Sequence, residues 1–139
     1  MARASRRRGD AARRHADTLR FILFEARPAG LSFQQLVRAS GLTPCQVRSG
    51  LAMFKDIIAE NGWPPLSWTR ADGYQLGALK DVLEKYERSV ISEKLTEFRR
   101  FLTATVLPHE QAHPGDKWIK YLVAQVNSIE STLDLMKTA

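Results

Sequence analysis

Two histidines, His109 and His113, spell H-E-x-x-H together with the glutamate between them. In many metalloproteases a helix places both imidazoles of this motif on one face, where they bind zinc and the glutamate acts as general base. The neighbouring residues argue against that chemistry. Pro114 follows His113 directly and biases it away from helical angles, and Pro108 precedes the motif, so at most one helical turn is available. A polar connecting loop is predicted.

Other enzyme chemistry has even less support in the sequence. A third zinc ligand would have to be Glu130, on a helix with no sign of shaping a cleft. There is no evident nucleophile–base pair and no phosphate-binding loop. We therefore expect a protein that is not an enzyme, with no catalytic residue, no metal and no cofactor.

The composition is that of an ordinary folded protein. The 139 residues fit one compact domain plus an appendage, with 44% hydrophobic and 26% charged residues. No apolar run approaches the roughly 20 residues that span a bilayer, and the arginine-rich N-terminus lacks the apolar stretch of a secretory signal. A single cysteine, Cys45, fits a reducing cytoplasm. We expect a cytoplasmic, nucleoid-associated protein with no membrane partner.

The net charge of +6 is concentrated at the N-terminus. Residues 1–20 hold seven Arg and two Asp, residues 21–78 hold five basic and four acidic residues, and residues 79–139 hold nine of each. Basic arms of this kind commonly bind nucleic acid phosphates, although others only keep a protein soluble. We interpret residues 1–11 as a disordered basic arm.

Three helices and a hairpin are predicted after this arm. A helical period starts near Ala11, and residues 27–30, RPAG, end it. A second helix follows a capping box at Ser32, with Leu36, Val37 and Ala39 on its apolar side, and Gly41 suits its end. The apolar face of the first helix is formed by Ala12, Ala16, Leu19, Leu23 and Ala26.

The third helix has three agreeing start signals, because Thr43 suits the N-cap, a proline follows it, and Gln46 completes a capping box. Asn61-Gly62 would end it. Next, Asp72-Gly73 favours a β-hairpin with strand positions Leu66, Trp68, Tyr74 and Leu76, and the aromatic residues there are predicted to pack in the core. The buried stripe of the third helix is expected at Val47, Leu51, Phe54 and Ile58.

Residues 79–139 read as two long amphipathic helices, one from about Leu79 to Val106 and one from about Trp118. They would pair within the chain or between two chains, and the sequence leaves both arrangements open. Apolar residues on these helices are the candidates for dimerisation or interaction: Leu83, Tyr86, Val90, Phe98, Leu102, Trp118, Leu122, Val126, Ile129 and Leu133.

The segments LVRASGLTPCQVRSGL and WTRADGYQL carry a family resemblance. Together residues 12–78 resemble a winged helix-turn-helix DNA-binding domain of the bacterial, phage or plasmid regulator type. The resemblance implies a mainly α fold with a small β-hairpin, the winged helix-turn-helix being followed by the two C-terminal helices. It also implies that the third helix enters the major groove of double-stranded DNA.

The rotation of the third helix gives specific contact candidates. Its first two turns are small and polar, which allows a close approach to bases. With Arg48 on the flank, the residues on its outward side are Cys45, Gln46, Ser49, Ala52, Met53 and Asp56. The expected base contacts are Gln46 to adenine and Arg48 to guanine, with Ser49 permissive. A solvated helix face is the alternative.

The remaining candidates would contact the DNA backbone or the minor groove. Gln34, Gln35 and Arg38 on the second helix and Thr43 at the start of the third would set position but not sequence. Arg70 would lie near the wing tip. The arm would contribute Arg6, Arg7, Arg8, Arg13 and Arg14.

We thus expect a sequence-specific DNA-binding protein, a transcriptional regulator that binds as a homodimer. A dimer through residues 79–139 would place two third helices about one helical turn apart on a palindromic site. Two alternatives stay open. The fold could serve replication, partition or recombination of a phage or plasmid, or it could be a protein-interaction module whose C-terminal helices dock on another protein. The target sequence, the sign of regulation, any effector and the host are not specified.

Overall fold

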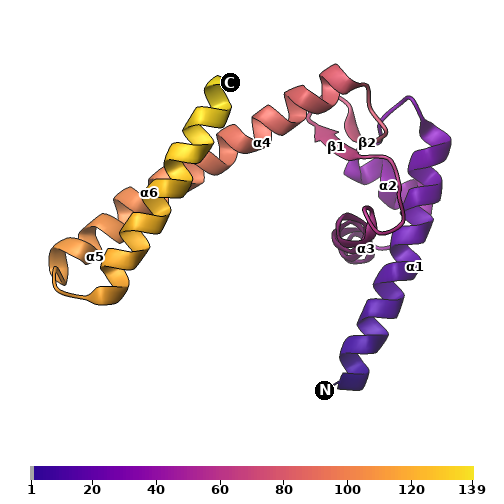
Figure 1. Cartoon of the computed structure of the whole chain (residues 1–139). Helices are drawn as coiled ribbons and strands as arrows, with labels where there is room; N and C mark the ends of the chain where they lie inside the picture. Colours follow the sequence, from indigo (N-terminus) through magenta and orange to yellow (C-terminus); the bar gives the residue numbers. More distant parts are fainter. Residues whose placement is uncertain (1) are drawn as a thin grey trace. The chain divides into compact units, whose positions relative to one another are not determined.

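The computed structural model describes residues 2–139, with side chains from residue 9 onward. It confirms a mainly helical chain with one small two-stranded antiparallel sheet (Figure 1). The chain divides within a helix into two compact units, Met1–Leu83 and Glu84–Ala139. In order the elements are α1 (Ala2–Ala26), α2 (Phe33–Ser40), α3 (Pro44–Ile57), β1 (Leu66–Thr69), β2 (Gly73–Leu76), α4 (Lys80–Phe101), the π-helical turn η1 (Leu102–Val106), α5 (Leu107–Ala112) and α6 (Lys117–Thr138).

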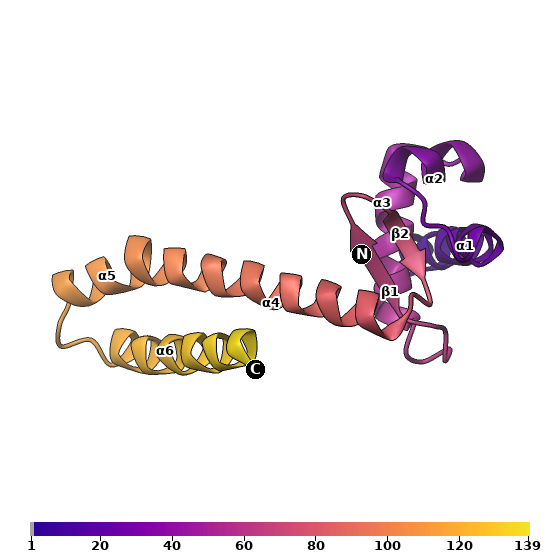
Figure 2. The same cartoon turned by 90° about the horizontal axis from the view of Figure 1, so that it is seen from above.

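The core of the first unit lies where α1 crosses α3, and Figure 2 shows α1 end-on beside α3. Gly50 of α3 faces α1 at this crossing. A Cβ there would lie 2.9 Å from the Cβ of His15 and 2.9 Å from Cδ1 of Leu19, so the missing side chain allows the close approach. The buried residues are Ala16, Leu19, Leu23, Leu36, Val47, Leu51, Phe54, Ile57 and Leu76.

Both predicted capping boxes are formed. The Ser32 amide donates to Gln35 Oε1 at 2.8 Å while Ser32 Oγ accepts from the Gln35 amide at 3.1 Å, which starts α2. Thr43 and Gln46 repeat this exchange at 2.9 and 3.2 Å at the start of α3. Between the two helices Gly41 adopts φ +68°, the left-handed conformation that the sequence predicted. The local signals therefore set the bihelical turn.

The hairpin pairs Trp68 with Tyr74 and closes around residues 70–72, where the Asp72 amide donates to Thr69 Oγ1 at 3.0 Å. A feature that was not predicted joins it to the helices. Leu31, between α1 and α2, exchanges two backbone hydrogen bonds with Tyr74, at 2.8 and 2.7 Å. The segment before α2 thus extends the sheet by one bridge next to β2 and fixes the hairpin against the start of α2.

Several expectations for the first unit need correction. Helix α1 begins at Ala2 and not near Ala11, so the segment predicted as disordered belongs to a helix; alanine and arginine are both strong helix formers. On α3 the buried residue is Ile57, while Ile58 is only half-buried. Ala39 on α2 is exposed, because the short helix buries only Leu36.

Two further side chains of this unit differ from expectation in their exposure. Met53, predicted to point outward, packs against the core. Trp68, predicted as core, is 45% exposed because the buried face of β1 carries the small residue Ser67 instead. Tyr74 packs against the core as expected, and so does Trp63, whose ring centroid lies 5.2 Å from that of Phe54.

The second unit is a helical hairpin within one chain, which answers the question the sequence left open. A small core joins η1 to α6, and Phe98, Leu122 and Val123 pack around it. Across the two arms Arg99 binds Glu130 at 3.0 Å and Asp134 at 3.1 Å. The hydrogen bond that Arg99 donates to the Glu130 carboxylate raises the pKa of Arg99. The buried residues of this core are Leu102, Val106, Ile119 and Val126.

One prediction about this unit was wrong. The helix from Lys80 does not stop before Pro108 but continues to Ala112, because the wider π turn η1, which ends two residues before the proline, accommodates its missing donor. Trp118 and Ile129, two of the candidates for dimerisation or interaction, are exposed, since Ile119 and Val126 form the inner face of α6. No helix among residues 2–139 is long and apolar enough to cross a membrane.

Candidate nucleic-acid interface

The first two turns of α3 are exposed, as a helix that approaches DNA requires. Val47 and Gly50 point into the core, whereas Cys45, Arg48 and Ser49 are exposed. Further along, the exposed side chain of Ala52 is also small. Near the end of the helix the carboxylate of Asp56 is exposed and would repel phosphates. The exposed N-terminal half is therefore the part suited to a groove.

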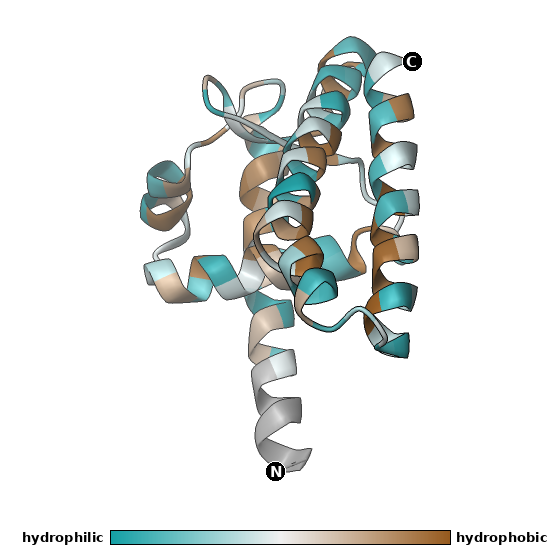
Figure 3. Ribbon diagram, turned by 90° about the vertical axis from the view of Figure 1, so that its left-hand side faces the viewer, coloured by the Kyte–Doolittle hydropathy of each residue, from teal (hydrophilic) through white to brown (hydrophobic). Residues whose placement is uncertain are grey.

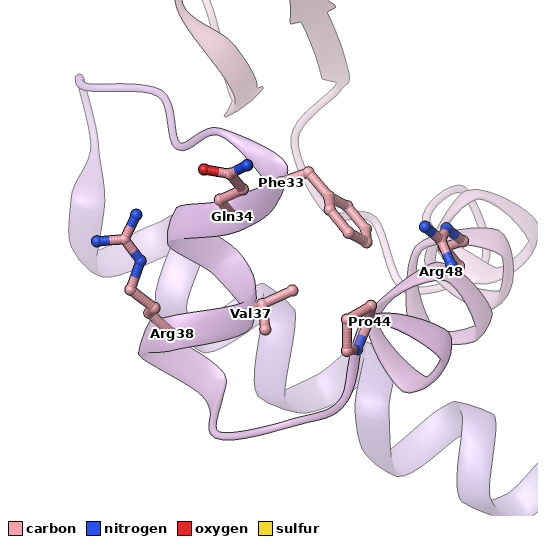
Figure 4. Close-up of a pocket in the computed structure, with 6 residues that line it drawn as sticks. All are labelled: Phe33, Gln34, Val37, Arg38, Pro44 and Arg48. Carbon is pink, nitrogen blue, oxygen red and sulfur yellow. The ribbon is translucent and has the colours of Figure 1, made fainter.

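Arg48 lies on the flank of α3 that faces α2. Its guanidinium carbon is 5.2 Å from the centre of the Phe33 ring, a cation–π contact that orients the planar donor group. An open groove of about 490 Å³ separates the two helices here, and Figure 4 shows Arg38 at its α2 side and Arg48 at its α3 side. The groove is lined by Phe33, Gln34, Val37, Arg38, Pro44 and Arg48.

Gln46 and Ser49 lie on the other flank of α3, which faces α1. They line a second, smaller crevice of about 240 Å³ together with Cys45 and with His15 of α1. Gln46 and Arg48 are two residues apart on the helix and so point about 200° apart. The two candidate base readers therefore cannot address the same base pair.

The capping box restricts what Gln46 can do. A glutamine reads adenine with both its oxygen and its nitrogen. Here Gln46 Oε1 accepts from the Thr43 amide at 2.9 Å, which uses one of its two lone pairs and holds the oxygen at the backbone, so Nε2 is the group best placed to contact a base. Gln46 is thus prepared to donate to a base acceptor rather than to pair with adenine through two bonds.

The predicted backbone contacts divide into free and engaged side chains. Gln34 and Arg38 are exposed on α2 and line the groove. Gln35 and Thr43 are exposed too, but their side chains are held in the capping boxes. In the first turn of α3, Pro44 has no amide hydrogen and the Gln46 amide is bound to Thr43. The amide of Cys45 is the remaining candidate donor for a phosphate.

The other predicted contacts lie outside α2 and α3. Arg70 is exposed in the hairpin turn. Arg13 and Arg14 are exposed on α1. The side chains of Arg6, Arg7 and Arg8 lie outside the residues that the structure describes.

The sequence reasoning missed Phe33, Pro44 and His15. Phe33 supports Arg48, and Pro44, noted only as a helix start, lines the groove. Phe33 precedes Val37 by four residues, and this helical spacing is the signal that could have identified it as part of the apolar face. His15 had no visible partner in the sequence, and its place beside Cys45 depends on how α1 crosses α3.

The H-E-x-x-H residues occupy the end of α5. The imidazole rings of His109 and His113 are 5.4 Å apart, and His113 ends the helix with φ −135° and ψ 63°, outside the helical region as predicted. Glu130, the candidate third ligand, is bound to Arg99. Within the described part of the chain, no three His, Cys, Asp or Glu side chains are grouped to hold a metal ion.

Comparison with known proteins identifies no relative. No protein-family model, no curated protein and no solved structure matches this chain.

Proposed function

We propose that this protein is a sequence-specific double-stranded DNA-binding protein that regulates transcription, with unit 1 acting as a winged helix-turn-helix domain. The observation that carries the proposal is the exposed first half of α3, with Arg48 held on Phe33 at one flank and Gln46 and Ser49 at the other. The bridge between Leu31 and Tyr74 adds support, because it fixes the hairpin against the start of α2, the first helix of the bihelical unit.

In this proposal α3 enters the major groove by its N-terminal half. Arg48 donates two hydrogen bonds to O6 and N7 of a guanine, for which its planar guanidinium is suited. Gln46 donates through Nε2 to an acceptor on a different base pair, since its oxygen is engaged in the cap. Cys45, Ser49 and Ala52 are small enough to let the helix backbone approach the base edges.

Phosphate contacts come from the groove between α2 and α3 and from the hairpin turn. Arg38 and Gln34 would bind one strand, and Arg70 would reach the backbone or minor groove beside the hairpin. Arg13 and Arg14 on α1 add positive charge. Each phosphate that is neutralised releases counterions, so affinity must fall steeply with salt.

The regulator is proposed to act as a homodimer on a palindromic site, located on the nucleoid in the cytoplasm. The residues first predicted for the dimer cannot all serve it, because Leu102 and Val126 are buried inside the helical hairpin of unit 2. Other apolar residues of that unit remain exposed.

The test is selection from a pool of random duplexes at two salt concentrations, followed by sequencing of the retained DNA. A short enriched motif that weakens or changes when Arg48 or Gln46 becomes Ala supports the proposal. Retention without any motif would reduce it to general DNA binding, and no retention at low salt would overturn it.

A second candidate function has one observation in its favour. Phe21, 63% exposed, and Phe24 lie on the outer side of α1, opposite its core-facing residues. A protein partner covering them would make unit 1 an interaction module. Such binding would persist at salt concentrations that abolish DNA binding, and Phe21→Glu would weaken it. A role in replication, partition or recombination would use the same DNA-binding surface.

A further inference from the structure

One side of α6 carries a row of uncharged residues that unit 2 leaves largely exposed, with only Leu122 packed in part against the hairpin core. Apolar bands recur along this helix in Figure 3, where it ends at the C-terminus. Trp118 is 59% exposed, Tyr121 61% and Ile129 42%, whereas the inner face of α6 holds Ile119 and Val126. The row, which we name the α6 seam, consists of Trp118, Leu122, Gln125, Ile129, Thr132 and Met136.

The α6 seam has the spacing of a coiled coil. Its steps alternate between four and three residues, so its members occupy successive a and d positions of a heptad repeat. The next row on the exposed side contains Tyr121, Ser128 and Leu135, which are also uncharged. The charged residues of α6, such as Lys120 and Asp134, lie outside both rows. A face without charge over the length of this helix is suited to a dry protein contact and not to phosphates.

We infer that the α6 seam binds the α6 seam of a second copy of this chain in antiparallel orientation. With the twofold axis at Asn127, every a position faces a d position of the other copy. Trp118 then faces Met136 of the second copy, and Gln125 faces its Ile129. Leu122 faces Thr132 in the same way. In each of these pairs a large residue thus opposes a smaller or more flexible one. A partner of unrelated sequence would have this complementary pattern of sizes only by coincidence.

The available area agrees with a dimer. The exposed parts of Trp118 in the seam and of Tyr121 in the adjoining row amount to roughly 250 Å², and Ile129 and Met136 of the seam add roughly 150 Å². Because interfaces are only about 60% apolar, this corresponds to roughly 650 Å² in total for each copy, close to the roughly 800 Å² of a standard interface. Unit 2 has only five buried apolar residues, Leu95 and the four of the hairpin core, so covering the seam also adds to its apolar burial.

This inference deepens the dimer part of the proposed function, but its test does not depend on DNA. Sedimentation equilibrium of the full chain over a range of concentrations should show a monomer–dimer equilibrium. Ile129→Glu places an unpaired charge in the middle of the seam and should raise the dimer dissociation constant at least about 100-fold. Leu79→Glu is the matched control, because Leu79 is 76% exposed and lies outside the seam.

Antiparallel pairing has its own signature. Gln125→Lys and Ile129→Glu should each be monomeric at a concentration where their mixture forms a heterodimer, since the lysine introduced in one copy then faces the glutamate introduced in the other. If Ile129→Glu loses its helical circular dichroism, Thr132→Glu, which replaces an exposed polar residue, takes its place as the charge in the seam.

Three results would overturn the inference. The full chain could be a monomer at all concentrations, its dimer could be unaffected by both Ile129→Glu and Thr132→Glu, or its dimer could be broken by Phe21→Glu but not by those two variants. The two proposals fail separately. A seam variant that is monomeric and still prefers one DNA half-site leaves DNA recognition intact, while a dimer that retains no DNA leaves the seam intact.

Discussion

Replacing Gly50 by alanine is expected to loosen the crossing of α1 and α3, on which the candidate interface is built. The new Cβ would lie 2.9 Å from Cδ1 of Leu19, 2.9 Å from Cβ of His15 and 3.2 Å from the carbonyl carbon of His15. The Leu19 methyl group can rotate away. The His15 atoms belong to or adjoin the α1 backbone, so relief requires the two helices to separate by a few tenths of an ångström.

The magnitude follows from two opposing effects. In an open helix, glycine to alanine stabilises by about 1 kcal/mol because alanine loses less backbone entropy on folding. Overpacking in a close-packed core destabilises by about 1–3 kcal/mol. We therefore expect Gly50→Ala to lower the free energy of unfolding by about 1 kcal/mol, which corresponds to a Tm lower by roughly 4–8 °C for a unit of this size.

Thermal and urea unfolding, followed by circular dichroism and by tryptophan fluorescence in a variant with Trp118 replaced by Phe, would measure this change, because Trp63 packs on Phe54 in the core. Gly9→Ala is the matched control, because Gly9 also lies in a helix but has no heavy atom within 4 Å of the added Cβ. It should leave stability unchanged or raise it by up to about 1 kcal/mol. An equal gain in both variants would refute the close crossing at Gly50.

Further predictions concern the two helices of the interface. Phe33→Ala removes the platform of Arg48 without changing charge and should weaken specific DNA binding about 2- to 5-fold, measured by fluorescence anisotropy. Arg38→Ala and Arg70→Ala should each reduce the slope of log affinity against log salt by about 1 while leaving the selected motif unchanged; a changed motif would contradict their backbone role. Ser32→Ala breaks a capping box and should lower the free energy of unfolding by about 1 kcal/mol in urea, whereas no change would mean that the cap is replaced by water.

Local signals were sufficient where a feature depends on a few neighbouring residues. The capping boxes at Ser32 and Thr43, the left-handed Gly41 and the reversal before Gly73 were all predictable, because each requires residue types at fixed short spacing. The order of the elements followed from these signals and the helical period. The buried faces of α1 and of most of α3 followed from the same period.

Features that depend on tertiary packing were not predictable. Helix α6 has apolar residues on more than one face, with Trp118 and Ile119 adjacent in the sequence. Packing against η1 decides which of these faces is buried. Passage of the helix through Pro108 depends on a π turn that no pattern announced. The predicted capping box already implied that Gln46 Oε1 accepts a hydrogen bond from the Thr43 amide. The conflict with adenine recognition follows only when it is noticed that the cap and the base contact use the same oxygen.

The most direct test of DNA recognition by α3 is the coupling between Arg48 and the base pair that it reads. Affinities of the wild type and of Arg48→Ala would be measured at one salt concentration, on the selected duplex and on duplexes with each G·C pair replaced in turn. At one pair the wild type should lose about 1–3 kcal/mol of binding free energy while Arg48→Ala loses almost none. Equal losses for the two proteins at every pair would contradict the account.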